Sequence, residues 1–339
     1  MQTALASNRQ TRRRVHVRPN LTIMKGTIAD LKFIRYGDMV VPIIMGKERR
    51  RVINHILPQG LNQYVNDLLA VNNLAQGMYN SNTAPISISG WGSSPGNSIQ
   101  LLNNGSVVQT LNATVIPVLN GSTVIWVFIA NDLSTASYSA NQVNLLASVN
   151  QVNTLAGSGV VQYSPPFNLA TATTSIVKQS GETISFIWEV QLNLGSYALT
   201  DFIIGILYSI PTVQTTCAGS NVIQGTFGGV HKIGFDAPYF FSSITLQYIG
   251  GSSSGNIPSI TTSYDGTNTY LVMSASISLS SQVTATSIVV NVSYEGGLAY
   301  FCINGQQLTS GSAIQIPYSA TLPSGTVTVT VTIEFSPAT

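Results

Sequence analysis

Strict alternation of apolar and polar residues constrains the fold of this chain more than any other feature. Between Thr326 and Phe335 every second residue is apolar, and the residues between them are threonines and one glutamate. Successive side chains of a β-strand point to opposite faces, so this pattern predicts a strand with one buried face and one face in water. The same period of two recurs from Ile288 to Tyr294. The predicted buried face of the last strand consists of Val327, Val329, Val331, Ile333 and Phe335.

Turn signals separate the alternating segments. Asn-Gly and Asp-Gly pairs favour the two-residue turns that join neighbouring antiparallel strands. They occur at Asn104-Gly105, Asn120-Gly121, Asp265-Gly266 and Asn304-Gly305. No crossover helices intervene, so the pattern predicts an antiparallel sandwich or barrel and not a parallel sheet.

One segment has the period of an amphipathic helix. After Pro58 and Gly60, apolar residues recur at intervals of three and four. The face that they form consists of Leu61, Tyr64, Val65, Leu68, Leu69, Leu74, Ala75 and Met78. The residues from Asn80 to Pro85 then predict a linker.

The length of the alternating region favours more than one β unit. Residues 85–339 exceed a typical single sandwich, and the SSSG run from Ser252 to Gly255 is the best internal breakpoint. We therefore expect a mainly β protein of the antiparallel jelly-roll or β-sandwich class, with two β-barrel domains, a basic N-terminal arm and one amphipathic helix. The expected segments are residues 1–56 (arm and extension), 57–84 (helix and linker), 85–245 (jelly roll) and 246–339 (a smaller β-sandwich).

Charge is rare and unevenly placed. Charged residues make up 8% of the chain, against about a quarter in an average protein. Twelve of the 14 Lys and Arg residues lie in the first 51 residues with only three acids, a net of +9, which leaves −7 for the rest of a chain whose total is +2. The first 20 residues hold almost nothing that could be buried. They predict a mobile arm, and residues 21–56 predict a partly ordered extension.

The basic segment is the most informative motif. Arginine binds phosphate through a planar fork of donors, so clusters of this kind suit a nucleic-acid backbone without reading its base sequence. A solvated tail or a nuclear-type address is the alternative interpretation. The predicted nucleic-acid-binding residues are Arg9, Arg12, Arg13, Arg14, Arg18, Lys25, Lys47, Arg49, Arg50 and Arg51.

The sequence offers no convincing catalytic constellation. Its scattered acids sit at predicted turns, where a short acid shapes the backbone. These acids are Asp132, Asp201, Asp236, Asp265 and Glu295. The histidines, His16, His55 and His231, lack the spacing of a metal site. We therefore expect no enzyme, cofactor, metal or small-molecule substrate. The pairing of Cys217 with Cys302 stays open.

Neither export nor membrane spanning is expected. The stretch from Thr11 to Asn20 has no apolar core of the kind that follows the first charges of a signal peptide. The most apolar windows, Met39 to Met45 and Phe202 to Ile210, are far shorter than the roughly 18 residues of a spanning helix.

A basic N-terminal segment, one helix and a β body poor in charge together resemble the layout of a jelly-roll major capsid protein. The resemblance is to icosahedral DNA viruses of thermophilic archaea, including the polyhedral viruses of Sulfolobus. It implies a virion protein made in the host cytoplasm that assembles with itself and with other capsid proteins such as a penton protein. It also implies an arm that faces viral DNA, with an inner membrane or nucleoprotein layer as a further partner. The shorter second β region departs from a symmetrical double jelly roll.

Two other classes stay open. An archaeal surface-layer or filament subunit would suit the Thr- and Ser-rich C-terminal strands equally well, although such proteins need an export signal or a pilin-type helix. A carbohydrate-binding or attachment β-sandwich would use exposed aromatics such as Trp91 or Tyr264 as a sugar platform.

Overall fold

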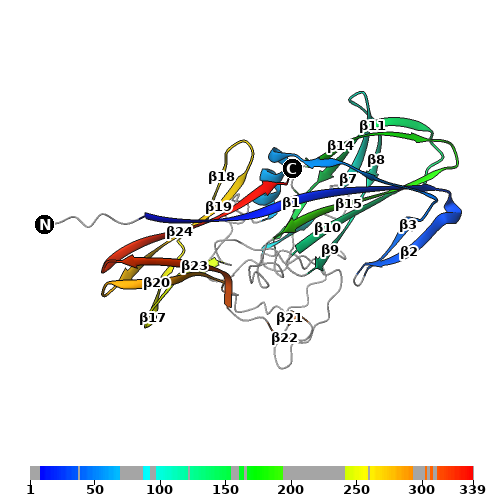
Figure 1. The fold of residues 1–339 in the computed structure, drawn as a ribbon. Coiled ribbons are helices and arrows are strands. Elements are labelled where there is room, and N and C mark those ends of the chain that lie inside the picture. Colours follow the sequence, from blue (N-terminus) through cyan, green and yellow to red (C-terminus); the bar gives the residue numbers. More distant parts are fainter. Residues whose placement is uncertain are drawn as a thin grey trace.

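The computed structural model is mainly β, with one α-helix among the residues that it describes (Figure 1). It describes residues 8–36, 39–68, 87–91, 97–120, 123–153, 160–163, 166–193, 241–258, 260–292, 302–303, 306–307 and 311–338. We call residues 16–193 the N-terminal region and residues 241–338 the C-terminal region.

The largest sheet has eight strands and extends through both regions. Its order is β18-β19-β24-β1-β15-β10-β9, and β4 also pairs with β1. The strands are β1 (Asn8–Gly26), β4 (Glu48–Val52), β9 (Thr114–Asn120), β10 (Thr123–Asp132), β15 (Thr183–Asn193), β18 (Ile260–Tyr264), β19 (Thr269–Leu279) and β24 (Gly325–Pro337).

Smaller sheets complete each region. In the N-terminal region a sheet in the order β5-β14-β11-β7-β8 consists of β5 (Asn54–Ile56), β7 (Ser98–Asn103), β8 (Ser106–Asn112), β11 (Tyr138–Ala147) and β14 (Phe167–Lys178). In the C-terminal region a sheet in the order β17-β16-β20-β23 consists of β16 (Phe241–Tyr248), β17 (Gly251–Asn256), β20 (Val283–Val292) and β23 (Gly311–Leu322). The remaining strands are β2 (Leu31–Tyr36) with β3 (Met39–Ile44), β6 (Ser87–Trp91) with β12 (Val149–Asn153) and β13 (Val160–Tyr163), and β21 (Cys302–Ile303) with β22 (Gln306–Gln307).

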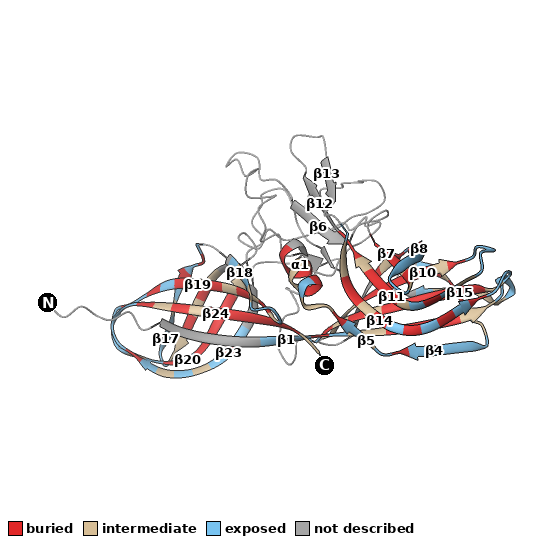
Figure 2. Ribbon diagram, turned by 90° about the horizontal axis from the view of Figure 1, so that it is seen from above, coloured by how far each residue is buried: buried red, intermediate tan, exposed pale blue. Residues whose placement is uncertain are grey.

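The long first strand joins the two regions. Residues Asn8–Val17 of β1 run parallel to β24, and His16–Gly26 run antiparallel to β15. In Figure 2 this strand passes from one half of the molecule to the other. The expected mobile arm is therefore wrong for residues 8–20, and Val17 is fully buried. Backbone pairing needs no apolar side chain at every position, so charge density did not exclude a strand.

The alternating pattern of β24 is confirmed on its apolar face. Its five predicted core residues are all buried. The other face behaves as predicted only in its first half, where Thr326 is exposed. Thr332 and Glu334 are buried, so the prediction of a fully wet face is wrong at this end of the strand. A period of two assigns residues to faces, but it does not say what covers each face.

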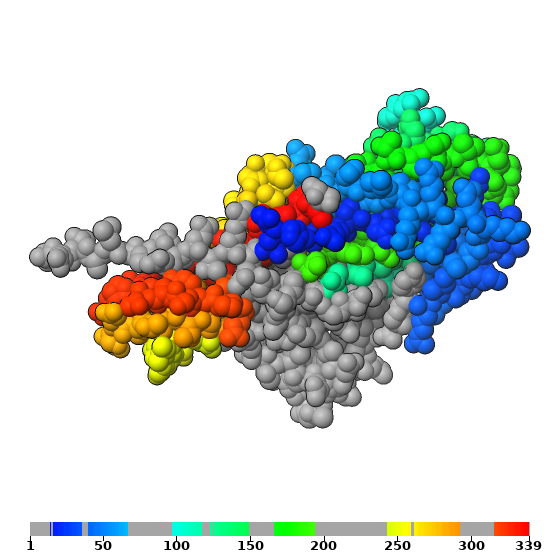
Figure 3. All heavy atoms as spheres, in the orientation of Figure 1, coloured from blue at the N-terminus to red at the C-terminus, as the bar shows by residue number. Residues whose placement is uncertain are grey.

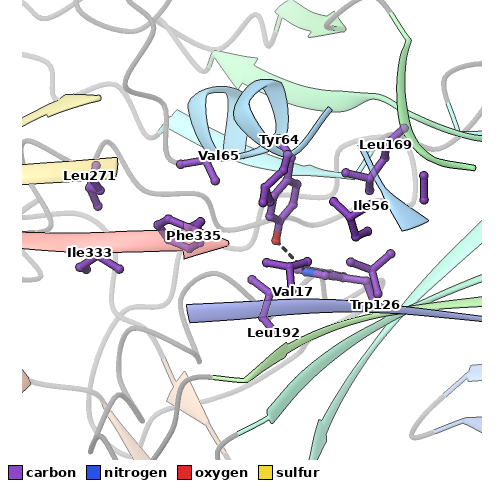
Figure 4. Packing of buried hydrophobic residues seen from close by; sticks show 14 of the residues in the cluster. Val17, Ile56, Tyr64, Val65, Trp126, Leu169, Leu192, Leu271, Ile333 and Phe335 are labelled. Carbon is purple, nitrogen blue, oxygen red and sulfur yellow. Dashed lines mark hydrogen bonds between the residues drawn. The ribbon is translucent and has the colours of Figure 1, made fainter. Parts of the chain in front are cut away.

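The predicted helix is present as α1 (Pro58–Leu68). Leu61, Tyr64 and Val65 are buried as expected, and the predicted residues after Leu68 lie outside the described part of the chain. The indole Nε1 of Trp126 donates a hydrogen bond to the Tyr64 hydroxyl at 3.0 Å. Figure 4 shows Tyr64 pointing toward Trp126, while Val65 lies on the side of Leu271 and Phe335. The helix thus packs between the two regions.

The turn signals agree with the structure where they can be compared. Asn104 and Gly105 both have positive φ and join β7 to β8, and Gly266 has positive φ in the hairpin of β18 and β19. Gly121, Asn304 and Gly305 lie outside the described residues, as does the predicted Asn80 to Pro85 linker. The SSSG run is not a breakpoint, because it forms β17 and pairs with β16. Small residues suit that position, since a Cβ on Gly255 would lie 2.2 Å from the Ser276 carbonyl oxygen.

Candidate nucleic-acid interface

The pairing of β1 with β4 gathers three arginines on one face. Thr22 of β1 lies opposite Arg51 of β4, and Met24 lies opposite Arg49. Directly opposite residues of an antiparallel pair share a face, and alternation along β1 adds Arg18 to that face. Arg18, Arg49 and Arg51 are all exposed. We call these three residues the basic row.

The opposite face of the same two strands enters the core. Val17, Leu21 and Ile23 of β1 are buried, and Val52 of β4 lies opposite Leu21. In the space-filling view of Figure 3, the blue atoms of the N-terminal segment lie at the surface along the middle of the molecule and gather at one end.

On the face of the basic row, Thr22 and Met24 of β1 are also buried, and Met24 packs against Val41 and Ile43 in a second apolar cluster. The exposed part of this face therefore consists of Arg49 and Arg51 on β4 and of Arg18 farther along β1.

One carboxylate lies on the face of the basic row. Glu189 of β15 is opposite Asn20, whose side-chain amide donates a hydrogen bond to it at 3.0 Å. The Gln191 amide donates to the same carboxylate oxygen at 3.2 Å, and Gln191 is opposite Arg18. Two amide donors hold this carboxylate, and three exposed arginines outnumber it, so the face stays positive.

Two of the predicted phosphate ligands have structural partners on the other face. Arg50 donates to the Ser175 carbonyl oxygen of β14 at 3.0 Å. Lys25 donates to the Val177 carbonyl oxygen at 2.9 Å and forms an ion pair with Glu182 at 2.8 Å. The Lys25 ammonium and then the Gln179 amide lower the pKa of Glu182. Arg50 and Lys25 thus tie β1 and β4 to the second sheet of the N-terminal region.

Arg14 is engaged with the C-terminal region. Its Nε lies 3.1 Å from a carboxylate oxygen of Glu334, which is 1% exposed, while the Arg14 side chain is 56% exposed. The Ser336 hydroxyl donates to the other oxygen at 2.9 Å. A buried carboxylate destabilises the fold unless an opposite charge or hydrogen bonds compensate for its lost hydration. Arg14 supplies the opposite charge for Glu334.

The other predicted residues are placed only in part. Arg9, Arg12 and Arg13 lie on β1 in register with Val329, Thr332 and Ile333, and their side chains are outside the described part of the structure. Lys47 is exposed between β3 and β4. The structure therefore brings Arg18, Arg49 and Arg51 together and directs Arg14, Lys25 and Arg50 to other partners.

Sequence reasoning missed a buried polar cluster at the end of β10. The Lys178 ammonium donates to the carbonyl oxygens of Ser134 at 2.6 Å and Ala136 at 2.8 Å, and it lies 3.9 Å from Asp132. The Tyr138 hydroxyl donates to Asp132 at 2.8 Å. Burial raises the pKa of Asp132, but the bonds from Ser134 and Tyr138 and the Lys178 charge outweigh it, so the net shift is downward. Burial, then the bond to Asp132, raises the pKa of Tyr138.

A sequence signal for this cluster existed. Along β14 the side chains of Ala172, Thr174, Ile176 and Lys178 alternate with exposed positions and are all buried. The period of two therefore assigns Lys178 to the core side, where a lysine needs hydrogen-bond acceptors. The cluster fixes the loop between β10 and β11, and neither its lysine nor its carboxylate is open to a substrate.

The described residues contain no group of three or more His, Cys, Asp or Glu side chains that could hold a metal. Within the same ranges, no helix has the length and apolarity to cross a membrane. Asp132 and Asp265 occupy turns as predicted, since each accepts backbone N–H bonds from the residues that follow it. Asp201, Asp236, Glu295, His231 and Cys217 lie outside the described part, and so does the Trp91 side chain.

No protein-family model matches the chain, and no curated protein matches it.

Proposed function

We propose that this chain is a structural virion protein, a major capsid protein that assembles with itself into an icosahedral shell. Its partners are further copies, other capsid proteins such as a penton protein, and viral DNA, with an inner membrane or nucleoprotein layer beneath the shell. The finer fold that we propose is a jelly roll in the N-terminal region and a smaller β-sandwich in the C-terminal region. The protein acts in the virion after synthesis in the host cytoplasm and is not an enzyme.

The main support for this proposal is that the exposed Lys and Arg residues are confined to the N-terminal segment, while the remaining described surface is nearly free of them. After Arg51, the only Lys or Arg within the described ranges is Lys178, which is buried. The exposed faces of the C-terminal strands present neutral residues such as Thr261, Ser276 and Thr284. Neutral polar groups lose less hydration energy than ions when they enter a contact between subunits. A body of this kind suits contact with other copies, and a single basic face suits contact with phosphate.

The position of the basic row changes how DNA would be bound. Strand pairing holds Arg18, Arg49 and Arg51 on a rigid face, so binding does not depend on an arm that leaves the body. Contacts made from a rigid face require less ordering of side chains and backbone than contacts made from a free tail.

Substitution within one strand tests the DNA interface. The R49Q/R51Q double variant removes two charges of the basic row, and R50Q removes the neighbouring charge that faces the opposite way. Each lost phosphate contact reduces the slope of log affinity against log salt by about 0.9. We expect R49Q/R51Q to reduce that slope by roughly 1.8 in fluorescence anisotropy with a labelled DNA duplex. R50Q should leave it unchanged, and equal effects of the two variants would reject the interface.

Imaging of the assembled protein tests the shell. Purified protein should form closed particles in electron micrographs, and sedimentation velocity should show large assemblies whose formation the R49Q/R51Q variant does not abolish. Extended filaments or flat lattices would instead support a surface-layer or filament subunit. A monomer under all assembly conditions, with DNA present and absent, would contradict the proposal.

A further inference from the structure

A cavity of about 660 Å³ lies where three segments meet. Its walls are the start of α1, the start of β14 and the hairpin that joins β18 to β19. Figure 2 shows α1 between the two halves of the molecule, close to β18 and to β14. This volume falls within the range of about 300 to 1,000 Å³ that is typical of small-molecule sites.

The lining combines aromatic rings with neutral amides. Phe167 and Tyr264 supply the rings, and both side chains are half-buried. Gln59, Gln63 and Asn168 supply the amides, each of which can donate and accept hydrogen bonds. None of the described residues that line the cavity carries a charge at neutral pH.

Asn168, in the same wall, has a side-chain amide oxygen that accepts no hydrogen bond among the described residues. A buried polar atom without a partner destabilises a fold. Because this oxygen is also closed to solvent, a ligand in the open cavity does not reach it, and the hydrogen bonds to a ligand fall to Gln59 and Gln63.

The walls of the cavity are held in place by the backbone. The Leu57 amide donates to the Leu169 carbonyl oxygen at 2.9 Å, which ties the start of α1 to β14. Gly60 packs so closely that an added Cβ would lie 2.2 Å from the Asn168 carbonyl oxygen. On the opposite wall the Tyr264 hydroxyl donates to the Gly266 carbonyl oxygen at 2.8 Å. A fixed ring and a fixed backbone reduce the ordering that a ligand must impose.

We propose that this cavity binds a neutral carbohydrate. The aromatic rings pack against the C–H faces of a sugar ring, and the amides of Gln59 and Gln63 exchange hydrogen bonds with its hydroxyl groups. An anionic ligand would find no charged partner among the described side chains of the lining, and a purely apolar ligand would leave the lining amides desolvated. The site is independent of the basic row and of assembly, so its failure would not affect the proposed function.

Binding of defined sugars tests the site. Maltotriose, cellotriose, mannotriose, galactotriose and chitotriose serve as probes in saturation-transfer NMR and in titration calorimetry with the full chain. At least one should bind, and Q59L should weaken it about fivefold through the loss of one hydrogen bond. Y264A should weaken it by about tenfold through the loss of ring contact. Q315L, at an exposed glutamine on β23, is the matched control and should leave the affinity unchanged.

Three results would overturn the proposal. The first is that none of the five sugars binds while circular dichroism shows an intact β fold. The second is binding that Q59L and Y264A leave unchanged although both variants are folded. The third is competition of inorganic phosphate with the bound sugar, which would indicate an anion site at the start of α1.

Discussion

The N-terminal and C-terminal regions stabilise similar sheets with different kinds of buried side chain. The N-terminal region buries large aromatic side chains, among them Trp126, Trp188 and Phe186, together with the polar cluster around Lys178. The C-terminal region buries mainly aliphatic residues such as Leu271, Ile288 and Val331. Packing in the N-terminal region therefore depends in part on specific polar partners. Packing in the C-terminal region depends on the regular alternation of apolar and polar residues along its strands.

The two regions also differ in their content of basic residues. From residue 241 onward the sequence contains no Lys, Arg or His. Buried Glu334 is therefore neutralised by Arg14, which arrives on β1 from the other end of the chain. The C-terminal region obtains both a strand and a cation from the N-terminal segment. The difference shows that β1 is a structural element of both regions and not only a carrier of positive charge.

The largest single-residue effect is expected in the aromatic core. Trp126→Ala removes a fully buried ring and the hydrogen bond to Tyr64, and it should lower the free energy of unfolding by about 3–5 kcal/mol. Val331→Ala, at a fully buried aliphatic site of the other region, should have a smaller effect because fewer atoms are lost. Urea denaturation measures both, and a larger effect of Val331→Ala would reverse the comparison.

Removal of residues 1–15 tests the dependence of the C-terminal region on β1. This deletion eliminates most of the pairing with β24 and the Arg14 charge, but it leaves the pairing with β15 intact. Hydrogen exchange of β19 and β24 amides should accelerate by about a hundredfold, while β10 and β15 should change little. Equal acceleration in both regions would mean that the two regions unfold as one unit.

The Asp132 cluster predicts an acid-sensitive N-terminal region. Because the folded-state pKa of Asp132 is lowered, its contribution is fully present above the unfolded pKa of about 4 and is lost as pH falls through the folded value. Asp132→Asn should lower the free energy of unfolding by about 1–3 kcal/mol at pH 7, and by less at pH 2.5. Unfolding curves at the two pH values measure the difference. A constant effect would show that the charge of Asp132 is not what matters.

The Arg14–Glu334 ion pair should contribute less. More than half of the Arg14 side chain is exposed, so solvent screens the interaction. A double-mutant cycle with R14Q and E334Q should give a coupling free energy of about 1 kcal/mol, measured by urea denaturation. A coupling near zero would mean that other groups compensate the buried Glu334.

Turn glycines should have effects as small as that of the ion pair, and these effects should be alike in the two regions. Gly105 and Gly325 have φ values of 82° and 116°, and an added Cβ would meet nothing within 4 Å at either position. Substitution by alanine therefore tests backbone strain alone and should lower the free energy of unfolding by about 1 kcal/mol at each site. Thermal denaturation gives both values. A much larger effect at Gly325 would indicate that the C-terminal region is the more sensitive to its turns.

Local patterns predicted the features that the residues of one segment determine by themselves. The apolar face of β24, the turn at Asn104 and the buried face of α1 all follow from residues within one short segment. The basic segment misled the prediction because its order comes from β15 and β24, which are far away in the chain. The cavity beside Phe167 and Tyr264 was equally hidden, since no segment contains more than one of its walls.

The sequence by itself determined a mainly β chain, the amphipathic face of α1 and the gathering of positive charge near the N-terminus. Only the tertiary structure decided that β1 lies inside the largest sheet and that Arg50 contacts β14 on the face opposite to Arg49 and Arg51. It also decided that Arg14 forms an ion pair with the buried Glu334. The physical reason is that periodicity and charge are properties of one segment, whereas strand register and the pairing of buried charges depend on which segments meet.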